Sequence, residues 1–337
     1  MIIPAYNGEK FLSDCVSSVL NQHYENFEIV IIDDGSIDGT YDLACSFRSE
    51  KPLSIIRHER NLGLAATYNH GLEGSRGKFI LLLHQDCRLG SSDWLEKAEK
   101  HFSDPYMAVV TGQVLLDLND MSFTQRTFTF LRGIIPSKTP SPSEGIPFFE
   151  GKCDLCRKEV LLALGGFPSH EFMFSGEDQV VSYALRQRGY KILKDNTLVF
   201  REKISEGFRN NFRKEFVHGK TQAGISFKFG LFQLKGLGAS HHMRSRAINK
   251  LSRLAIVFTI FVLLAMSLAI RFELIVLPVL ILVGRSIFFA ITSTLHPIIK
   301  FTLPEAIATS IIGVLSDFIY SLGFLYGLFL SAFRRKL

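Results

Sequence analysis

The chain has 337 residues, a formal net charge of +6 and a mean hydropathy of +0.19, which is high for a wholly soluble protein. This length accommodates a globular domain together with a membrane region. Five cysteines without regular spacing exclude a disulfide framework and, with it, the small disulfide-stapled secreted proteins. The positive charge is concentrated in one segment, which excludes the uniformly basic surface typical of nucleic-acid-binding proteins.

The first part of the chain alternates strand and helix patterns. We predict strands at 2–4, 27–32, 53–57 and 79–83, of which 27–32 and 79–83 are apolar, with helices near 40–48 and 64–72. Buried strands without polar alternation, separated by helices, are typical of a parallel sheet covered on both faces. Such sheets bind ligands beyond the carboxyl ends of their strands. Asn7, Asp33, Asp34 and Asp86 are expected at that edge.

The middle of the chain is less regular. Residues 137–147 are rich in Pro and Ser, which predicts a loop. We predict helices at 158–164 and 178–188, and short strands at 191–193 and 198–200. Cys153 and Cys156 form a lone C-x-x-C without a second pair at zinc spacing. We interpret them as small apolar residues that flank a turn.

A basic segment precedes three apolar segments. Between Arg201 and Arg253 there are twelve Lys and Arg against three acidic residues, a net +9, which leaves −3 for the rest of the chain. Basic residues directly before apolar helices are typical of contact with anionic lipid headgroups and of cytoplasmic orientation. The apolar segments at 254–270, 273–295 and 305–333 are long enough to span a bilayer, although Arg285 and Asp317 interrupt two of them.

Four clusters of polar and glycine residues follow one another along the chain. They are Pro4-Ala5-Tyr6-Asn7; Asp33-Asp34-Gly35-Ser36; Asn61-Leu62-Gly63 with Asn69-His70-Gly71 and His84-Gln85-Asp86; and Gly176-Glu177-Asp178 with Arg186-Gln187-Arg188-Gly189-Tyr190. With Arg157-Lys158-Glu159 and Leu164-Gly165-Gly166-Phe167, they make residues 1–220 resemble the family 2 inverting glycosyltransferases.

That resemblance implies a fold and a domain organisation. The fold is the α/β GT-A fold of nucleotide-diphospho-sugar transferases, with a mostly parallel, Rossmann-like central sheet, followed here by a helical transmembrane region. We expect a catalytic domain over residues 1–200, a basic juxtamembrane segment over 201–253, and transmembrane helices within 254–333.

The resemblance also implies a donor nucleotide site. Asp34 would accept a hydrogen bond from a ring N–H of the base, while Pro4, Ala5 and Tyr6 pack against the nucleoside. The other donor-site residues by resemblance are Asn7, Asp33, Asn61, Gly63 and Asn69. The alternative for Asp34 is a turn or capping residue, because Asp is common in such positions.

A divalent metal is expected at His84-Gln85-Asp86, which corresponds to the Asp-x-Asp triplet of the family. Asp86 keeps the last carboxylate and would bind Mg²⁺ or Mn²⁺, which neutralises the leaving diphosphate. His84 departs from the family pattern. Three roles stay open for it: a metal ligand, a ribose or phosphate contact, and a structural residue. As a ligand, an imidazole favours Mn²⁺ over Mg²⁺.

The catalytic base implied by the resemblance is Asp178, with Glu177 beside it on the acceptor and diphosphate side. Inversion by direct displacement requires the acceptor hydroxyl to lose a proton to a nearby base. The alternative is helix capping, because an Asp at a helix start is stabilising. Arg213 lies where processive relatives carry Gln-x-x-Arg-Trp, and the missing Gln and Trp favour single-sugar transfer. Contact with the diphosphate and contact with a lipid headgroup both stay open for Arg213.

We therefore expect transfer of one sugar from a UDP-, GDP- or dTDP-sugar to a hydroxyl of a lipid-linked or membrane-proximal acceptor. The expected location is the cytoplasmic face of the cell membrane, with several spans, in cell-surface glycan synthesis. The alternative within the fold is a polyprenyl-phosphate sugar synthase, whose anionic acceptor needs no base. A dinucleotide-binding oxidoreductase lacks support because no G-x-G-x-x-G follows the first strand. An inactive membrane scaffold is suggested by His84 alone, and nucleic acid is not expected as a partner.

Overall fold

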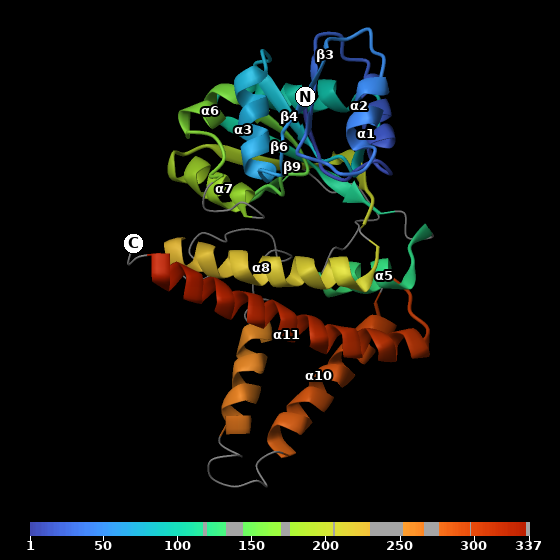
Figure 1. Ribbon diagram of the computed structural model, residues 1–337, viewed down its shortest axis with the longest axis vertical. Helices are drawn as coiled ribbons and strands as arrows, with labels where there is room; N and C mark the ends of the chain where they lie inside the picture. Colours follow the sequence, from blue (N-terminus) through green and yellow to red (C-terminus); the bar gives the residue numbers. More distant parts are fainter. Residues whose placement is uncertain are drawn as a thin grey trace. The chain divides into compact units, whose positions relative to one another are not determined.

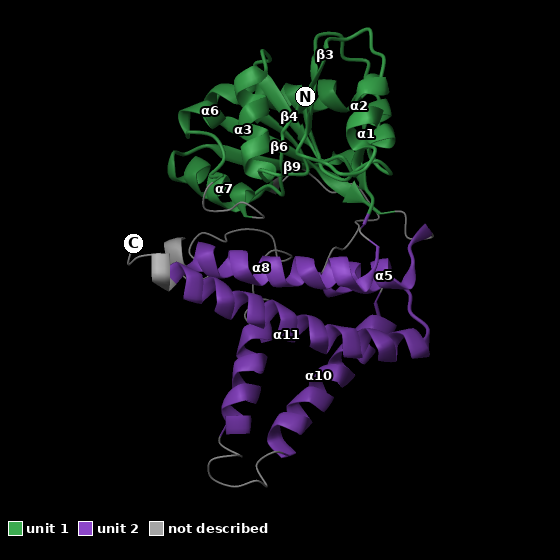
Figure 2. Cartoon of the chain, in the orientation of Figure 1, with its two compact units in different colours: residues 1–116, 136–203 green, residues 117–135, 204–337 purple. Residues whose placement is uncertain are grey.

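The computed structural model describes residues 1–116, 120–132, 144–169, 176–204, 206–229, 252–265, 276–296 and 298–334. They form two compact units (Figure 2): unit 1 contains residues 1–116 and 136–203, and unit 2 contains residues 117–135 and 204–337. Parts of the predicted loop (137–143), of the basic segment (205, 230–251) and of two apolar segments (266–270, 273–275) lie outside the described residues.

Unit 1 is built on one mixed sheet with the strand order β3-β2-β1-β4-β8-β6-β9-β5, and β7 pairs with β9 (Figure 1). The strands are β1 (Ile2–Ala5), β2 (Ile29–Asp33), β3 (Leu53–Arg57), β4 (Phe79–Leu83), β5 (Cys87–Leu89), β6 (Met107–Leu115), β7 (Glu144–Gly145), β8 (Cys153–Arg157) and β9 (Lys191–Glu202). The predicted parallel pairing is confirmed for β1 to β4. β8 lies antiparallel between β4 and β6, whereas β6 and β9 are parallel.

Helices cover both faces of this sheet. They are α1 (Leu12–Leu20), α2 (Thr40–Ser46), α3 (Leu64–Gly74), α4 (Trp94–Lys100), α6 (Lys158–Ala163) and α7 (Glu177–Gln187), with one turn of 3₁₀-helix at His101–Ser103. On one face, Ile3 and Ile31 of the sheet pack in the same core as Trp94 of α4. On the other face α3 approaches closely, because a Cβ atom at Gly71 would lie 2.6 Å from the side chain of Ile2. The sheet therefore holds the strand ends in fixed register.

Two sequence interpretations in unit 1 are corrected. Cys153 and Cys156 lie within β8 and are both fully buried, so they do not flank a turn. Residues three apart on a strand point to opposite faces, so the two thiols cannot bind one metal ion. The strands predicted at 191–193 and 198–200 are one strand, β9, which pairs with β6 through two register shifts.

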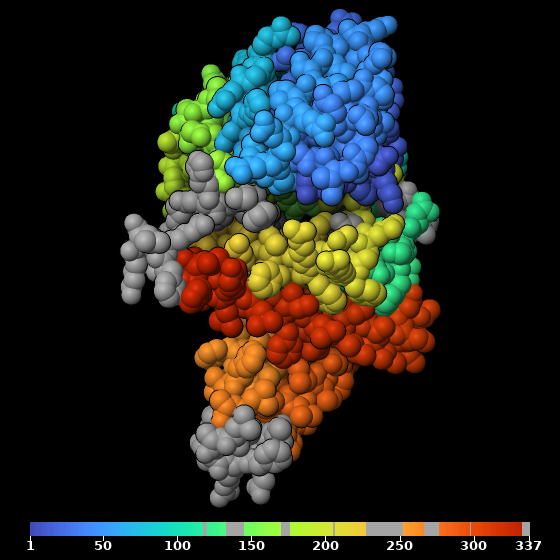
Figure 3. Space-filling model, viewed as in Figure 1, coloured from blue at the N-terminus to red at the C-terminus, as the bar shows by residue number. Residues whose placement is uncertain are grey.

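Unit 2 is helical. It contains α5 (Phe123–Leu131), α8 (Phe208–Phe229), an unlabelled helix (Ser252–Ala265), α10 (Val276–Thr294) and α11 (Leu303–Arg334). Ser122 and Gln125 form a reciprocal capping box that starts α5. Among the described residues, Val276–Thr294 and Leu303–Ser331 are long and apolar enough to cross a bilayer, whereas Ser252–Ala265 is shorter. α8 and α11 lie side by side (Figures 1 and 3).

Candidate active site

The loops that follow β1 and β4 are joined by Gln85, the middle residue of the His84-Gln85-Asp86 triplet. The Tyr6 N–H donates to Gln85 Oε1 at 3.0 Å, and Gln85 Nε2 donates to the Tyr6 carbonyl at 3.0 Å. A Cβ atom at Gly8 would lie 1.8 Å from Gln85 Oε1, so only glycine leaves room for this amide. Sequence reasoning did not assign Gln85 a role, because its partners are 79 residues away.

Asn7 joins the loop after β1 to the loop after β2. Its N–H donates to Ser36 Oγ at 2.9 Å, and its Oδ1 accepts the Ile37 N–H at 3.0 Å. Asn7 has φ of +48°, and it is the only non-glycine residue with positive φ in the described part of the chain. Asn adopts this conformation more readily than most residues. The structure thus shows Asn7 positioning two loops, which is compatible with its expected place in the donor site.

Asp34 is buried and orders the loop that follows β3. Its Oδ1 accepts the Leu62 N–H at 2.8 Å and lies 2.7 Å from His58 Nδ1. Its Oδ2 accepts the Gly63 N–H at 2.9 Å, where Gly63 precedes α3. An ionised carboxylate accepts about four hydrogen bonds. Asp34 therefore combines the expected turn chemistry with one remaining acceptor position.

Asp34 is connected through His58 to a second histidine, His70. The sequence analysis assigned neither histidine a role. His58 Nε2 lies 3.0 Å from His70 Nδ1, and the two rings are stacked with centroids 5.2 Å apart. Next to them, Arg57 lies over the Tyr41 ring and places its Nε 3.3 Å from Asp33 Oδ2. These contacts fix the ends of β2 and β3 with respect to each other.

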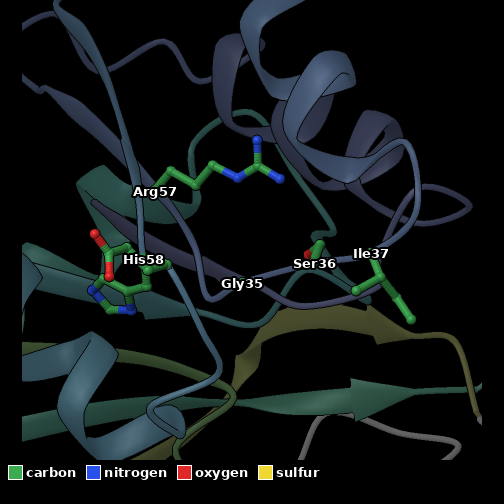
Figure 4. Close-up of a pocket in the computed structure, with 6 residues that line it drawn as sticks. Gly35, Ser36, Ile37, Arg57 and His58 are labelled. Atoms are coloured by element: carbon green, nitrogen blue, oxygen red, sulfur yellow. The ribbon is translucent and has the colours of Figure 1, made fainter.

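A cavity of about 420 Å³ opens beside these strand ends (Figure 4). It is lined by Gly35, Ser36, Ile37, Arg57, His58 and Glu59. Figure 4 shows the Arg57 guanidinium directed away from the His58 ring, so the two side chains border different parts of the cavity. A volume of this size lies within the range of small-molecule sites, roughly 300–1,000 Å³.

The other donor-site candidates have defined positions. Pro4 and Ala5 are buried within β1, Tyr6 is 45% exposed and Asn61 is exposed. The Asn69 side chain forms two 2.7 Å hydrogen bonds with the backbone N–H and carbonyl of Phe167. Asn69 thereby ties α3 to the Gly165-Gly166-Phe167 segment. Arg213 is exposed on α8 and belongs to unit 2, whereas the other candidates belong to unit 1.

His84 and Asp86 stand close enough to share an ion. His84 Nδ1 lies 4.0 Å from Asp86 Oδ1, and each side chain is 25% exposed. The described residues contain no group of three or more His, Cys, Asp or Glu side chains that could hold a metal ion. Mg²⁺ and similar ions often take one or two protein ligands and complete their shell with water and substrate phosphates. The pair fits such a site, with most ligands supplied from outside the protein.

Glu177 and Asp178 occupy the first turn of α7, after Gly176 in a left-handed conformation with φ of 93°. Glu177 is buried, and its pKa is raised to about 8 by that burial and by the negative charge of Asp178. Asp178 is half-buried, and its Oδ1 accepts the Gln179 N–H at 2.8 Å. Neighbouring carboxyl groups in different environments are typical of acid–base sites.

The Glu177-Asp178 pair lies at the same sheet edge as the His84-Gln85-Asp86 triplet. The His84 N–H donates to the Lys152 carbonyl at 2.9 Å. A Cβ atom at the adjacent Gly151 would lie 3.6 Å from the Cβ of Asp178. Tyr68 holds the Gly151 backbone in place, because its hydroxyl donates to the Gly151 carbonyl at 2.7 Å. Asp178 and the backbone of His84 therefore both lie against the Gly151-Lys152 segment.

A further carboxyl group, that of Asp154, was not identified from the sequence. It lies on β8, is fully buried, and neither oxygen has a hydrogen-bond partner among the described residues. Burial raises its pKa to about 7; the nearby Thr111 hydroxyl opposes this, and the charges of Glu150 and Asp178 add to it. Its position as an acidic residue between apolar residues of one strand is the sequence feature that could have identified it.

The sheet order, the helices on both faces and the polar loops at the strand ends define the GT-A class of nucleotide-diphospho-sugar transferases. Residues 1–165 match the model of the family described as "Glycosyl transferase family 2". The first half of the chain is thus a family 2 glycosyltransferase domain, and the protein is a glycosyltransferase.

Sequence relatives include two enzymes named for O-antigen synthesis. The chain is 28% identical over 230 residues to O-antigen chain rhamnosyltransferase RfbN of Salmonella typhimurium, which covers 65% of this chain and 70% of that relative. It is 29% identical over 199 residues to O-antigen chain rhamnosyltransferase WbaN of Salmonella anatum, covering 57% and 62%. Putative glycosyltransferase EpsH of Bacillus subtilis is 34% identical over 96 residues, which span 28% of this chain and 26% of EpsH.

Solved structures share the fold. The mannosyltransferase PcManGT from Pyrobaculum calidifontis, in complex with GDP-Man and Mn²⁺, superposes with a TM-score of 0.56 at 17% identity, covering 100% of this chain and 87% of that one. GalNAc-T7 with UDP, GalNAc and Mn²⁺ gives a TM-score of 0.50 at 17% identity, covering 73% and 52%. At this identity the likeness concerns the fold.

Proposed function

We propose that this glycosyltransferase inverts the anomeric centre and adds one sugar to a hydroxyl of a lipid-linked or membrane-proximal acceptor in cell-surface glycan synthesis. The observation that carries the proposal is the Glu177-Asp178 pair at the edge that also holds His84 and Asp86. A raised pKa of about 8 keeps Glu177 protonated at neutral pH. Asp178 is the partly exposed carboxylate of the pair, and we assign it the role of base.

The reaction is a direct displacement. The acceptor hydroxyl oxygen forms a bond to the anomeric carbon while the bond from that carbon to the diphosphate oxygen breaks. The hydroxyl proton passes to the Asp178 carboxylate, and the nucleoside diphosphate leaves with the bonding electrons. A base in hydrogen-bond reach contributes about 10²–10⁴-fold to such a step.

The donor nucleotide is assigned to the cavity beside Asp34. Asp34 keeps one acceptor position for a ring N–H, and Tyr6 presents an exposed aromatic surface at the neighbouring strand end. Asp86 and His84 would hold a divalent ion, which supplies positive charge for the leaving diphosphate. The Mn²⁺ present in PcManGT and GalNAc-T7 supports this assignment.

The acceptor class is inferred from relatives and from unit 2. RfbN and WbaN are named for O-antigen chains, which supports a growing cell-surface glycan as the acceptor. The apolar α10 and α11 support a membrane location, and the net +9 between Arg201 and Arg253 supports a cytoplasmic catalytic side. Nucleotide-sugar and acceptor would then meet at the membrane surface.

Nucleotide binding and turnover test the proposal. We expect one of UDP, GDP and dTDP to bind by isothermal titration in a Mn²⁺-dependent manner, and the matching nucleotide-sugar to be hydrolysed slowly without acceptor. Asp86→Ala should abolish the metal-dependent binding. His84→Asp restores an all-carboxylate triplet and should improve the use of Mg²⁺. Absence of binding for all three nucleotides, with and without Mn²⁺, would contradict the proposal.

The acceptor test separates the two candidate reactions. A polyprenyl-phosphate sugar synthase transfers to a phosphate, which needs no base. Transfer to polyprenyl phosphate that survives Asp178→Asn unchanged would favour that synthase. Loss of transfer to a hydroxyl acceptor in the same variant, with donor binding intact, supports the hydroxyl reaction.

A further inference from the structure

The exposed side of α11 is apolar along most of its length. Its exposed large side chains are Leu303, Ile307, Ile311, Leu315, Leu322, Leu325, Tyr326 and Phe329. At 3.6 residues per turn they form one apolar stripe along the helix. The buried side is mixed: Thr309, Ser316 and Asp317 lie on it together with Ile312, Tyr320 and Phe324. An outward apolar stripe over a buried side that contains polar and charged residues indicates a lipid-facing helix.

The buried side of α11 is held by an ion cluster. Asp317 accepts hydrogen bonds from Arg253, at the start of the helix Ser252–Ala265, and from Arg285 of α10, the latter at 2.9 Å. Arg253 also reaches Glu215 of α8 at 2.9 Å. All four side chains are at least nine-tenths buried. Four helices of unit 2 thus meet at one point, and separating them would leave unpaired buried charges.

α8 is packed against α11 backbone to backbone. A Cβ atom at Gly219 would lie 2.0 Å from the Tyr320 carbonyl oxygen, and one at Gly323 would lie 2.1 Å from the Phe216 carbonyl oxygen. At Gly327 the distance to the Lys220 carbonyl oxygen would be 2.4 Å. Glycines at such contacts are typical of closely packed helix pairs. The two helices therefore have to occupy the same depth in any membrane.

The other side of α8 is cationic. Arg209, Arg213 and Lys214 are exposed on it, next to Asn210 and His218. If α11 crossed the bilayer, α8 would be carried into the hydrocarbon with these charges, which is strongly unfavourable. If α11 lies in the interface, its apolar stripe meets acyl chains while the α8 cations stay among headgroups and water.

The helix Ser252–Ala265 and α10 extend from α11 to the same side of unit 2 (Figure 1). Phe258, Phe261 and Leu280 on these two helices are exposed. Arg253 and Arg285 pair these two helices with Asp317 of α11, and Phe261 of the first helix also lies against Phe318 of α11, with ring centroids 6.2 Å apart. Because both arginines pair with Asp317, the chain lies at one depth at Arg253 and at Arg285.

We propose that α11 lies in the plane of the membrane interface beside α8, that its apolar stripe contacts the acyl chains of an anionic lipid bilayer, and that only the region between Arg253 and Arg285 enters the bilayer. Both ends of unit 2 are then on one side of the membrane. Arg334, Arg335 and Lys336 stay on the side of the basic segment, in agreement with the positive-inside rule. Three crossings would place them opposite.

Protease protection in oriented vesicles tests the sidedness without altering α11. One epitope is added after Leu337 and another is inserted after Glu50, an exposed loop residue of unit 1. No apolar segment separates unit 1 from α8 in the chain. We expect protease to remove both epitopes from the same vesicle orientation and neither from the other. Protection of the C-terminal epitope where the Glu50 epitope is cleaved would mean that α11 crosses, and would overturn the proposal.

Labelling depth tests the orientation of α11 directly. In a Cys45→Ser background, which removes the one exposed thiol among the five cysteines, Ile307→Cys, Leu315→Cys and Leu325→Cys carry a fluorophore in phosphatidylcholine–phosphatidylglycerol vesicles. An in-plane helix gives one shallow depth at all three positions, measured by quenching with brominated lipids. A crossing helix spreads them over about 27 Å, at 1.5 Å per residue. Phe258→Cys is the control and is expected deeper. Neither readout involves sugar transfer, so the result is independent of the proposed reaction.

Discussion

Glu177 and Asp178 are adjacent in the chain but differ in burial and in charge. Burial and the Asp178 charge raise the pKa of Glu177 to about 8, so Glu177 is protonated at pH 7. Protonated Glu and Gln have nearly the same shape, so Glu177→Gln should keep most of the activity at pH 7. Asp178→Asn removes a carboxylate and should lower transfer by roughly 10²–10⁴-fold.

Steady-state transfer and donor titration of the two variants, compared with the parent, check this prediction. Donor affinity should change little in Asp178→Asn, because Asn keeps the size of Asp and can still accept the Gln179 N–H. Near-normal transfer by Asp178→Asn would return Asp178 to a capping role. Equal losses in both variants would show that the site depends on the pair and not on one base.

The buried carboxyl of Asp154 should make the stability of the folded chain depend on pH. Its pKa rises from the ordinary 3.8 to about 7 in the folded chain, mainly through burial. The folded state then binds more protons than the unfolded state, so this group lowers stability as pH rises from about 4 to 7, with little change above 7. Asp154→Asn cannot ionise. Relative to the parent, the variant should gain up to about 3 kcal/mol between pH 5 and pH 8.

Thermal unfolding of parent and Asp154→Asn across that pH range measures the effect. The pKa of Glu177 is also raised, so Glu177 also makes stability fall as pH rises. The effect of Asp154 is therefore measured by the difference in stability between parent and variant at each pH, and not by the pH slope of either protein. An unpaired Asn amide is unfavourable at every pH and shifts the whole curve equally. A difference that stays constant from pH 5 to pH 8 would rule out ionisation of Asp154 as its source.

At the scale of elements, the sequence located β3 and β4 with the observed bounds. β4 is a short apolar run, whereas β3 also contains the exposed Ser54 and Arg57. β8 could not be placed, since its antiparallel position between β4 and β6 depends on pairings far apart in the chain. β9 was predicted as two strands, at 191–193 and 198–200, but it is continuous through Asp195. Asp195 is held by hydrogen bonds from Thr197 and His101.

The candidate site was predicted where its residues follow strands, and missed where contacts cross between loops. Asp34 and Asp86 were found because they end apolar runs. His58 and Gln85 were not, because their roles arise from partners 24 and 79 residues away. α5 was also missed, because residues 123–131 pack with the helices of unit 2 and not with the sheet that surrounds them in sequence.

The α8–α11 contact predicts that alanine substitution affects stability differently at two glycines of unit 2. A Cβ at Gly323 would lie 2.1 Å from the Phe216 carbonyl oxygen, so Gly323→Ala forces backbone apart. Gly284 of α10 has no atom within 4 Å of its added Cβ, and Ala is the better helix former by about 1 kcal/mol. We expect Gly323→Ala to lose several kcal/mol of stability or fail to accumulate, and Gly284→Ala to be neutral or stabilising.

Thermal inactivation of the detergent-solubilised chain measures both variants under one condition. The pair controls for the removal of glycine from an apolar helix, since only the contact differs. Similar midpoints for Gly323→Ala and Gly284→Ala would mean that α8 and α11 separate easily, and would also weaken the inference that they share one depth in the membrane.

At the scale of the whole chain, composition predicted a membrane region but not the arrangement of its helices. Arg285 and Asp317 looked like interruptions of two separate spans. In the structure they form an ion pair, with Arg285 Nε and Asp317 Oδ2 2.9 Å apart. Each buried charge is therefore balanced by the other. Charged residues within apolar helices are commonly paired in this way. No one-dimensional hydropathy pattern contains that pairing.

Membrane attachment should therefore have an apolar and an electrostatic part that can be separated. The exposed apolar side chains of α10 and the helix Ser252–Ala265 favour insertion, and this part does not depend on salt. The cations of α8 attract anionic headgroups, and 1 M salt screens them, because the Debye length falls to about 3 Å. The parent chain should remain in the membrane pellet through 1 M salt and alkaline carbonate, and leave only with detergent.

Charge reversal on α8 distinguishes the two parts. Arg213→Glu with Lys214→Glu should weaken recruitment to anionic vesicles, as measured by flotation at low salt, because each cation near such a surface contributes about 1 kcal/mol. The same double variant should resist carbonate as the parent does, since the inserted helices are unchanged. Gln at both positions is the matched control and should give an intermediate recruitment. Release of the parent by salt alone would mean that the basic residues are the anchor and that the apolar helices of unit 2 pack against protein instead of lipid.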